Sequence, residues 1–323
     1  MTSNKCAKIE CSSPSGGDLN TLGYQVVPCP NVMDGFCFDT YVGGFREFID
    51  PMAQVGIGSY GGLGNPSSVH SDVIRTLRGK LVRIQQEVLR GVYGADWFYQ
   101  SMLERVSCRY PGTKVTTDPW HRDCTVDYSD GINDQVKVFG GWFNMDTRPQ
   151  YFSCLPGSQN EPDPSGGFNK LRKEDAAIYK ARAACIEVPP GHMLMMHELI
   201  VHRIWPSKVP ADGPSSWRLY LKCKLSRNCV SAYPMHDVLE TIRTQGVPRL
   251  NHKQLFFPSY AQLHMACHQE KLMDFSNNVK PLFRTEEGRG FVKRKMTSLL
   301  DAGEELFAAY TADEIAQLTP TKL

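Results

Sequence analysis

The sequence predicts a mainly β core with α-helical segments before and after it. Between residues 103 and 228, short apolar and β-branched runs alternate with Pro- and Gly-containing turns, as in an all-β sandwich or barrel. Apolar residues at three- and four-residue steps predict a long helix before this region and shorter helices after it. We therefore expect an irregular N-terminal arm (1–65), a helical layer packed on the core (66–102), the β core (103–228) and a C-terminal helical region (229–323).

Composition narrows the class of protein. The chain has 323 residues, 41% of them hydrophobic and 22% charged, which is enough for one large domain with additions or for two domains. The formal charge is +2 and the basic residues are dispersed, so there is no strong nucleic-acid footprint. Eleven cysteines without a Cys-x-x-Cys pair indicate reduced thiols. Without a signal-peptide pattern or a membrane-length apolar run, we expect a soluble, intracellular protein, most simply cytoplasmic. The oligomeric state is left open.

The residues before the core contain one clear periodic segment. The first 35 residues are rich in Ser, Gly, Pro and Cys and show no apolar period, which predicts an irregular arm. The Gly-rich segment 56–64 lacks the Gly-Lys-Ser/Thr ending of a phosphate loop and predicts a simple loop. A helix capped by Ser67 or Ser68 should then run to Gly91 and pack on a sheet through Val69, Val73, Leu77, Leu81, Ile84 and Val88.

The core itself should consist of short strands. We expect them at 104–110, 136–145, 151–155, 185–188, 192–202 and 217–225. The segment 160–184 contains Pro, Gly and a charged helical piece, and is predicted to cross one rim as a loop. Four further helices are expected at 236–244, 260–275, 297–310 and 311–318.

His121 and Asp123 stand two residues apart in the segment Trp120-His121-Arg122-Asp123. On an extended strand both side chains leave the same face, so an imidazole nitrogen and a carboxylate oxygen can meet at one metal ion. Such a pair also arises by chance in a solvated turn. A second histidine further along the chain would complete a set of two histidines and one carboxylate.

Three histidines follow at five-residue steps, at His192, His197 and His202. A zinc-protease motif needs histidines four residues apart on a helix, whereas Pro190-Gly191 favours a strand here. On a continuous strand His197 and His202 would point to opposite faces, so that only one faces the site. We expect His202 to be the ligand, and His192 and His197 to be structural.

Arg218 follows His202 by sixteen residues, which leaves room for a loop and a return onto the adjacent strand. Its strand alternates, so Arg218, Tyr220 and Lys222 share a face. A guanidinium inside a barrel needs a partner, and a bidentate carboxylate ligand suits it. The alternative is a rim residue paired with an acidic neighbour.

The order of these motifs resembles the iron(II)/2-oxoglutarate-dependent dioxygenase superfamily, and within it the phytanoyl-CoA dioxygenase-like branch. The resemblance spans about Arg105 to Leu225. It is carried by Trp120-His121-Arg122-Asp123, Leu155-Pro156-Gly157-Ser158, Pro190-Gly191, His202 and Arg218. The chain departs from the family pattern at Gln159, where a histidine is common, and at His192, where an acidic residue is common.

The resemblance implies a double-stranded β-helix, a cupin-like jelly roll. It implies that His121, Asp123 and His202 hold Fe(II), that 2-oxoglutarate is a co-substrate anchored on Arg218, and that O2 is the oxidant. Trp142 would lie beside the keto acid or simply pack in the core, and Asn144 shares its face of the strand. Hydroxylation of a small-molecule or side-chain substrate, with release of succinate and CO2, is expected. Since Asp123 occupies a ligand position, halogenation is disfavoured.

Two other classes are compatible with the same residues. A non-catalytic binding or structural protein could retain the jelly-roll framework, because a fold does not fix an activity. A cupin-like metalloenzyme without a keto acid would lack an inward-facing Arg218. The substrate is not specified by the sequence: Tyr99, Phe152, Trp205 and the 160–184 loop could line a rim for a lipid, a peptide side chain, a base or a small metabolite.

Overall fold

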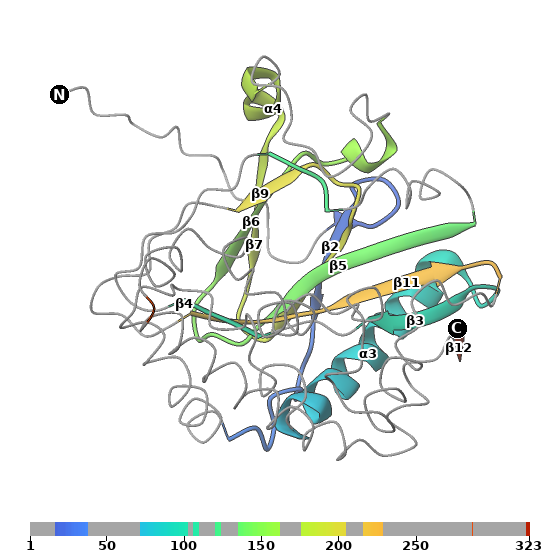
Figure 1. The fold of residues 1–323 in the computed structure, drawn as a ribbon, viewed down its shortest axis with the longest axis vertical. Helices are drawn as coiled ribbons and strands as arrows, with labels where there is room; N and C mark the ends of the chain where they lie inside the picture. The colour runs from blue at the N-terminus through green and yellow to red at the C-terminus, as the bar shows by residue number, and fades with distance from the viewer. Residues whose placement is uncertain are drawn as a thin grey trace.

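Two antiparallel β-sheets form the framework of the part of the chain that the structure describes (Figure 1). This computed structural model describes residues 17–37, 72–102, 106–109, 120–123, 135–161, 176–204, 216–228, 286 and 321–323. The large sheet contains β1 (Gly17–Asp18), β2 (Tyr24–Pro28), β3 (Phe98–Met102), β4 (Val106–Arg109), β5 (Val136–Asn144), β8 (His192–His197), β10 (Ser216–Tyr220), β11 (Lys222–Ser226) and β12 (Thr321–Lys322). The small sheet contains β6 (Gln150–Cys154), β7 (Ala184–Val188) and β9 (His202–Ile204).

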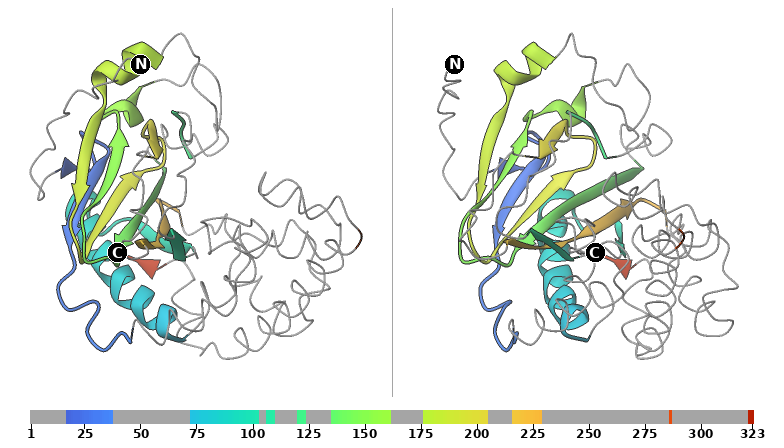
Figure 2. Two further views of the ribbon diagram at one scale, coloured as in Figure 1. Left: turned by 90° about the vertical axis from the view of Figure 1, so that its left-hand side faces the viewer. Right: turned by 60° about the vertical axis from the view of Figure 1, so that its left-hand side comes forward.

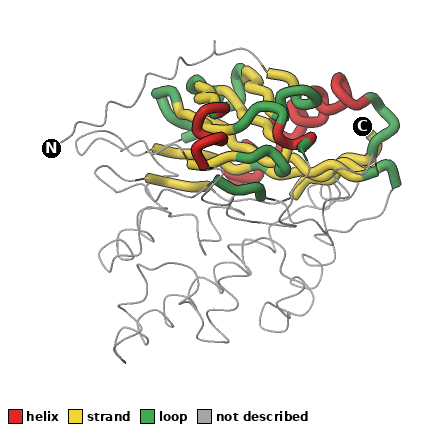
Figure 3. Tube along the Cα trace, turned by 90° about the horizontal axis from the view of Figure 1, so that it is seen from above, coloured by secondary structure: helices red, strands yellow, loops and turns green. Residues whose placement is uncertain are grey.

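The large sheet follows the order β1-β2-β8-β5-β11-β3-β12, and β10 connects β5 to β4. Strands β10 and β11 face β5 in one common register, with Arg218 opposite Asn144 and Cys223 opposite Phe139. They are therefore one continuous ladder interrupted at Leu221, whose N–H still donates to the Gly141 carbonyl at 3.1 Å. The small sheet has the order β7-β6-β9. Figure 3 shows the described part of the chain from above, with its strands side by side.

Alternation along β5 places successive side chains in two different cores. Trp142 is buried between the sheets, in a cluster that contains Phe152 from β6, Ile186 from β7 and Leu194 from β8. Its neighbour Phe143 points to the opposite face of the large sheet and belongs to a second cluster. The arrangement is a β-sandwich, as the short strands predict, with α3 covering the outer face of the large sheet.

Helix α3 (Asp72–Tyr93) confirms the long helix expected before the core. The helix lies against the strands of the core (Figure 2). Leu77 and Leu81 are buried as predicted, in a cluster that also contains Phe139. The buried stripe is rotated from the expected one, however, since Ile74 and Leu89 are buried while Val73, Ile84 and Val88 are half-buried. Gln85 lies within this stripe, and its side-chain carbonyl accepts the Tyr99 hydroxyl at 3.0 Å, which stabilises the buried amide.

The expected irregular arm over 1–65 is wrong at β2. Residues Tyr24–Pro28 form a strand of the large sheet, antiparallel to β8, with Val26 opposite Leu194. The segment escaped prediction because it is short, lies between Gly and Pro, and buries both Val26 and Val27 on opposite faces, which removes the alternation. The prediction of a helical layer over residues 66–102 is likewise wrong at its end, where β3 is a strand of the large sheet.

Within the core, β5, β6 and β7 confirm the strands expected at 136–145, 151–155 and 185–188. The continuous strand expected over 192–202 is wrong. Strand β8 ends at His197, the chain turns with an Ile200 N–H to His197 carbonyl bond of 2.9 Å, and β9 begins in the other sheet. The charged helical piece of the 160–184 segment is α4 (Ala176–Arg182), and η2 (Ser158–Asn160) follows the Pro156-Gly157 turn.

Several expectations fall outside the described residues, namely the 56–64 loop and the four helices between 236 and 318. The last residues do return to the large sheet, where β12 pairs with β3 and Leu323 is buried in the core beneath α3. The domain boundaries and the jelly-roll topology remain predictions. Among the described residues, no helix is long and apolar enough to cross a membrane.

Candidate metal centre

His121, Asp123 and His202 converge on one point. Each offers a ligand atom, and these atoms all lie within 4.8 Å of one another. The Asp123 carboxylate lies between the two histidines, with Oδ1 3.3 Å from His121 Nε2 and Oδ2 3.6 Å from His202 Nε2. The two imidazole centroids are 4.4 Å apart. The structure thus brings together the three residues that the sequence predicts as metal ligands.

Backbone hydrogen bonds explain this convergence. His121 and His202 form an isolated antiparallel bridge in which each N–H donates to the other's carbonyl at 2.9 Å. Residues directly opposite in such a bridge project to the same side, which places the imidazoles together. The Asp123 N–H donates to the Glu198 carbonyl at 3.0 Å and fixes the third residue. His202 reaches the cluster from the small sheet and not from a continuous strand through His197, and its role as a metal ligand stays a prediction.

The His202 ring is oriented by its own turn. Nδ1 lies 3.0 Å from the Ile200 carbonyl. Because a carbonyl only accepts, we assign the proton to Nδ1, which leaves the Nε2 lone pair toward Asp123 and available to a metal. Metal-binding histidines commonly have such a bond on the far nitrogen.

The charge of the site favours a cation. Burial alone would raise the pKa of Asp123, but His202, His121 and Lys222 outweigh that effect and hold the pKa well below its usual range. The carboxylate is therefore ionised. His121 and His202 are 8% and 7% exposed, while the Asp123 side chain is 32% exposed, so the carboxylate is the most accessible of the three groups.

The geometry fits a six-coordinate transition metal. With metal–ligand distances of about 2.1 Å, two adjacent ligands of an octahedron lie about 3 Å apart. The observed 3.3 Å and 3.6 Å separations, which join the two histidines to different oxygens of Asp123, lie near that value. Two imidazoles and one carboxylate on one face form the donor set of non-haem iron oxygenases, with the opposite positions open. The cluster could therefore hold such an ion.

Arg218 is buried on β10, with 8% of its surface exposed. Its Nε donates to Gln150 Oε1 at 2.7 Å, and its guanidinium carbon lies 4.4 Å from the centroid of the Trp142 ring. The Gln150 amide cannot flip, because Nε2 donates to the Asp146 carboxylate at 2.8 Å and to the Trp217 carbonyl at 2.9 Å. Gln150 therefore presents its oxygen to Arg218 and fixes the plane of the guanidinium.

Aromatic contacts connect Arg218 to the metal ligands. Trp142 packs on Phe152 with centroids 5.7 Å apart, and Phe152 packs on the His202 ring at 5.6 Å. Trp142 is thus a core residue and also a neighbour of Arg218. Its indole N–H is buried and has no hydrogen-bond partner in the described part of the chain, so it could donate to a ligand.

Asn144 lies opposite Arg218, but its amide is occupied by backbone groups. Nδ2 donates to the carbonyls of Arg148 and Val188 at 2.9 and 2.8 Å, and Oδ1 accepts the Asp146 N–H at 2.9 Å. These bonds shape the turn that delivers Gln150 to Arg218. A direct contact between Asn144 and a cofactor remains a prediction.

The other two histidines of the segment have structural contacts. His197 Nδ1 accepts the Leu199 N–H at 3.2 Å, and its ring packs on Phe139 at 5.2 Å. His192 Nδ1 lies 3.0 Å from the Pro190 carbonyl. Gln159, the other position at which the chain departs from the pattern it resembles, donates to the carbonyls of Asn20 and Thr21 and so joins the N-terminal loop to the core.

Sequence reasoning missed two polar residues of the site, Gln150 and Glu198, and the ion pair that Lys222 forms. Gln150 gives no signal, since it is an isolated amide at the start of a strand. Glu198 and Lys222 form a largely buried ion pair with an N–O distance of 2.5 Å. The alternation of Arg218 and Lys222 was visible in the sequence, but the partner of Lys222 was not.

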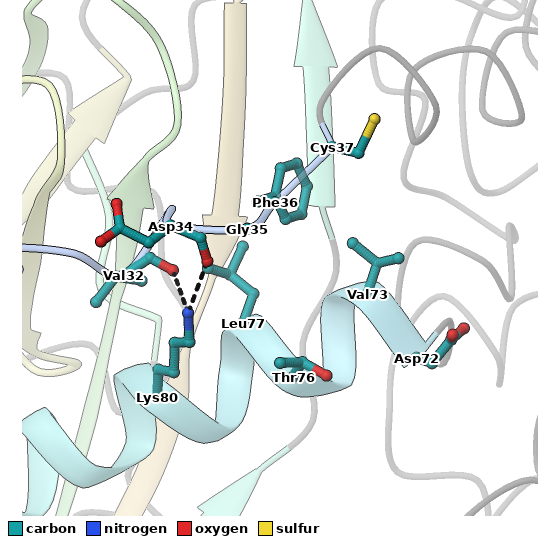
Figure 4. Close-up of a pocket in the computed structure, with 10 residues that line it drawn as sticks. All are labelled: Val32, Asp34, Gly35, Phe36, Cys37, Asp72, Val73, Thr76, Leu77 and Lys80. Atoms are coloured by element: carbon teal, nitrogen blue, oxygen red, sulfur yellow. Dashed lines mark hydrogen bonds between the residues drawn. The ribbon is translucent and has the colours of Figure 1, made fainter.

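A separate cavity of about 230 Å³ lies at the start of α3 (Figure 4). Lys80 donates from its lining to the carbonyls of Val32 and Asp34, at 3.2 and 3.1 Å. It shares no residue with the metal cluster.

No protein-family model and no curated protein matches this chain. Solved structures do. AviO1 from Streptomyces viridochromogenes Tue57 is 16% identical, with 64% of this chain and 91% of that chain covered and a TM-score of 0.40. The epimerase SnoN, solved with Fe3+, α-ketoglutarate and nogalamycin RO, is 14% identical, with 64% and 80% covered and a TM-score of 0.41.

EvdO2 from Micromonospora carbonacea var. aurantiaca, solved with 2-oxoglutarate, is 12% identical, with 66% of this chain and 93% of that chain covered and a TM-score of 0.37. The metal and the keto acid belong to those proteins. Identities and TM-scores this low do not assign an activity to the chain, so its function has to be inferred from its own residues.

Proposed function

We propose that this chain is an iron(II)- and 2-oxoglutarate-dependent dioxygenase. One observation carries the proposal: the two-histidine, one-carboxylate cluster is connected to a buried, oriented arginine through the packed rings of Phe152 and Trp142. The cluster offers a metal one face of ligands, and the arginine offers a carboxylate a bidentate partner. A metalloenzyme that uses no keto acid would not need a buried arginine to bind a carboxylate.

In this proposal His121, Asp123 and His202 hold iron(II), and Arg218 binds the distal carboxylate of 2-oxoglutarate. Trp142 keeps the guanidinium in plane and offers its indole N–H to the same ligand. Bound iron(II) would supply the electrons through which O2 reacts with the keto acid. The inter-sheet cluster with Phe152 and Leu194 keeps water away from the reacting groups.

The overall reaction balances as a hydroxylation. The keto acid loses C1 as CO2 and gains one oxygen atom to become succinate, and the other atom of O2 enters a substrate C–H bond as a hydroxyl. Because Asp123 fills the third ligand position, a halide has no place on the metal. We place the chain with the phytanoyl-CoA dioxygenase-like branch on its motif order, and we infer a small-molecule or side-chain substrate.

The role of Arg218 can be tested with two keto acids that differ at one end. Both 2-oxoglutarate and pyruvate can chelate a metal, but pyruvate lacks the distal carboxylate. In Arg218→Ala we expect the affinity of the Mn(II)-loaded protein for 2-oxoglutarate to fall roughly 100-fold, the usual effect of removing one partner of a buried charge pair. The affinity for pyruvate should change little.

Isothermal titration calorimetry measures both affinities. If Arg218→Ala lost affinity equally for the two keto acids, Arg218 would not bind the distal carboxylate of 2-oxoglutarate. Wild-type protein that binds Mn(II) but neither keto acid would contradict the dioxygenase proposal and favour a binding or structural protein.

A further inference from the structure

A largely buried ion pair lies beside the metal centre, and neither of its residues is among those proposed to bind the metal or the keto acid. Glu198 is the first residue after β8 and is 3% exposed, and Lys222 is the first residue of β11. The Lys222 ammonium lies 2.5 Å from Glu198 Oε2. Because removing two charges from water is costly, such a pair is weak evidence for stability and calls for another explanation.

The turn that contains Glu198 holds two of the three metal ligands. Its carbonyl accepts the Asp123 N–H at 3.0 Å. Two residues later, the Ile200 carbonyl lies 3.0 Å from His202 Nδ1. Any shift of this turn would therefore move the Asp123 backbone and the His202 ring together.

Glu198 anchors the turn to the large sheet in two ways. Its N–H donates to the Val138 carbonyl on β5 at 3.0 Å. Its side chain passes over Gly140 on the same strand, where an added Cβ would lie 2.6 Å from Glu198 Oε1, and so reaches Lys222 on β11. The glycine leaves space for the carboxylate to cross one strand and meet a cation on the next.

We propose that Glu198 and Lys222 are a positioning pair that fixes the turn 197–200 to the sheet and thereby sets the geometry of Asp123 and His202 for the metal. This inference rests on the metal centre of the proposed function. It does not depend on the keto acid or on the identity of the substrate.

Positioning and simple electrostatics predict opposite results for Lys222→Met. Removing a positive charge near a dication should tighten metal binding if only the field matters. Loosening the turn should instead weaken metal binding, roughly 10- to 100-fold, as is usual when a residue that orients a metal ligand is lost. The sign of the change therefore separates the two roles.

The probe is Mn(II) alone, with the free ion measured by electron paramagnetic resonance in the full-length protein. We expect weaker binding in Lys222→Met and near wild-type binding in Lys222→Arg, which retains a cation. Lys224→Met is the matched control, because Lys224 lies two residues further along β11 and on the same side of the strand. It should bind Mn(II) as the wild type does.

The double variant Lys222→Met/Glu198→Met covers the case in which the single variant fails to fold, since it leaves no buried charge behind. It changes the net charge by zero, so a field effect predicts unchanged Mn(II) affinity and positioning predicts a loss. Folded variants that bind Mn(II) as tightly as the wild type, or more tightly, would overturn the positioning role while the metal centre stands. Wild type that binds no Mn(II) would overturn the centre and this inference together.

Discussion

At Arg218, two uncharged side chains determine where a charged one points. Gln150 accepts from Nε, and the Trp142 ring covers the face of the guanidinium. The amide is itself fixed by the Asp146 carboxylate, which also accepts the Trp217 N–H at 2.5 Å and the Ser216 hydroxyl at 2.7 Å. Binding of a ligand then costs little ordering free energy, because these contacts orient the arginine before the ligand arrives.

Gln150→Leu tests this network. The substitution removes the hydrogen bonds of the amide to Arg218, Asp146 and Trp217 at similar volume, so the guanidinium should lose its fixed plane. We expect the affinity for 2-oxoglutarate to fall roughly tenfold, about 1.4 kcal/mol, with Mn(II) affinity unchanged. Gln159→Leu is the matched control, because Gln159 is equally buried but binds the loop at Asn20 and Thr21. Calorimetry would contradict the prediction if the two variants lost keto-acid affinity equally.

His197 should make the stability of the fold depend on pH. Burial, with Lys137 and Arg122 nearby, lowers its pKa to about 4 from 6.5. Between these values the unfolded chain binds the proton and the folded chain does not, so the free energy of unfolding falls as the pH drops through this window. From pH 7 to pH 5 the loss attributable to His197 is about 2 kcal/mol.

Urea unfolding at the two pH values measures that loss. His197→Asn keeps an acceptor for the Leu199 N–H and cannot titrate, so its stability should change less over the same interval. If wild type and variant lost stability in parallel, the protonation of His197 would not contribute.

Some residues of the site could be predicted from the sequence and others could not. His121, Asp123, His202 and Arg218 could be found because charged and metal-binding side chains in a fixed order limit the possible chemistry. Gln150 could not, since its role depends on a turn between two strands that brings it across to β10.

At the level of the elements, β5 is the strand on which the site depends. It pairs with β8 on one side and with β10 and β11 on the other, and Trp142 lies on it. At Gly141 it approaches β8 so closely that an added Cβ would lie 2.0 Å from the Leu194 carbonyl, and φ there is +136°. This is a conformation and a contact that only glycine tolerates.

Gly141→Ala should therefore lower the free energy of unfolding by more than about 3 kcal/mol, since strain and a backbone clash act together. Gly91→Ala is the control: Gly91 lies in α3, and among the described residues outside its own helical turn no atom lies within 4 Å of the added Cβ. Alanine there should be neutral or stabilise by up to about 1 kcal/mol. Thermal and urea unfolding compare them. Two similar losses would contradict the close approach of β5 and β8.

The sequence pattern predicted β5, β6, β7 and α3, where the apolar period matches the element. It failed where tertiary contacts override local pattern. The turn 198–200 lies within an apolar run whose pattern predicts one continuous strand. Leu199, Ile200 and Val201 are apolar because they are buried, although they lie outside the strands. Strand β2 was missed because its five residues are too few to show a period.

Across the whole molecule, the candidate site requires both sheets. His202 comes from the small sheet, Arg218 from the large one, and His121 and Asp123 from a segment that pairs with β9 by a single bridge. Neither sheet alone contains the constellation, so metal and keto-acid binding should be lost together when the sandwich is disrupted. For the same reason, the order of the motifs along the chain predicted the site, whereas no single stretch of sequence could predict it.

The most direct test is an anaerobic titration of the apoprotein with iron(II) and 2-oxoglutarate, followed by visible absorption, in wild type and in His202→Ala. A weak charge-transfer band that appears in wild type only when both components are present, and is absent from a folded His202→Ala protein, is the predicted result. No band in folded wild-type protein, or an equal band in the variant, would contradict a metal–keto acid site built on His121, Asp123 and His202.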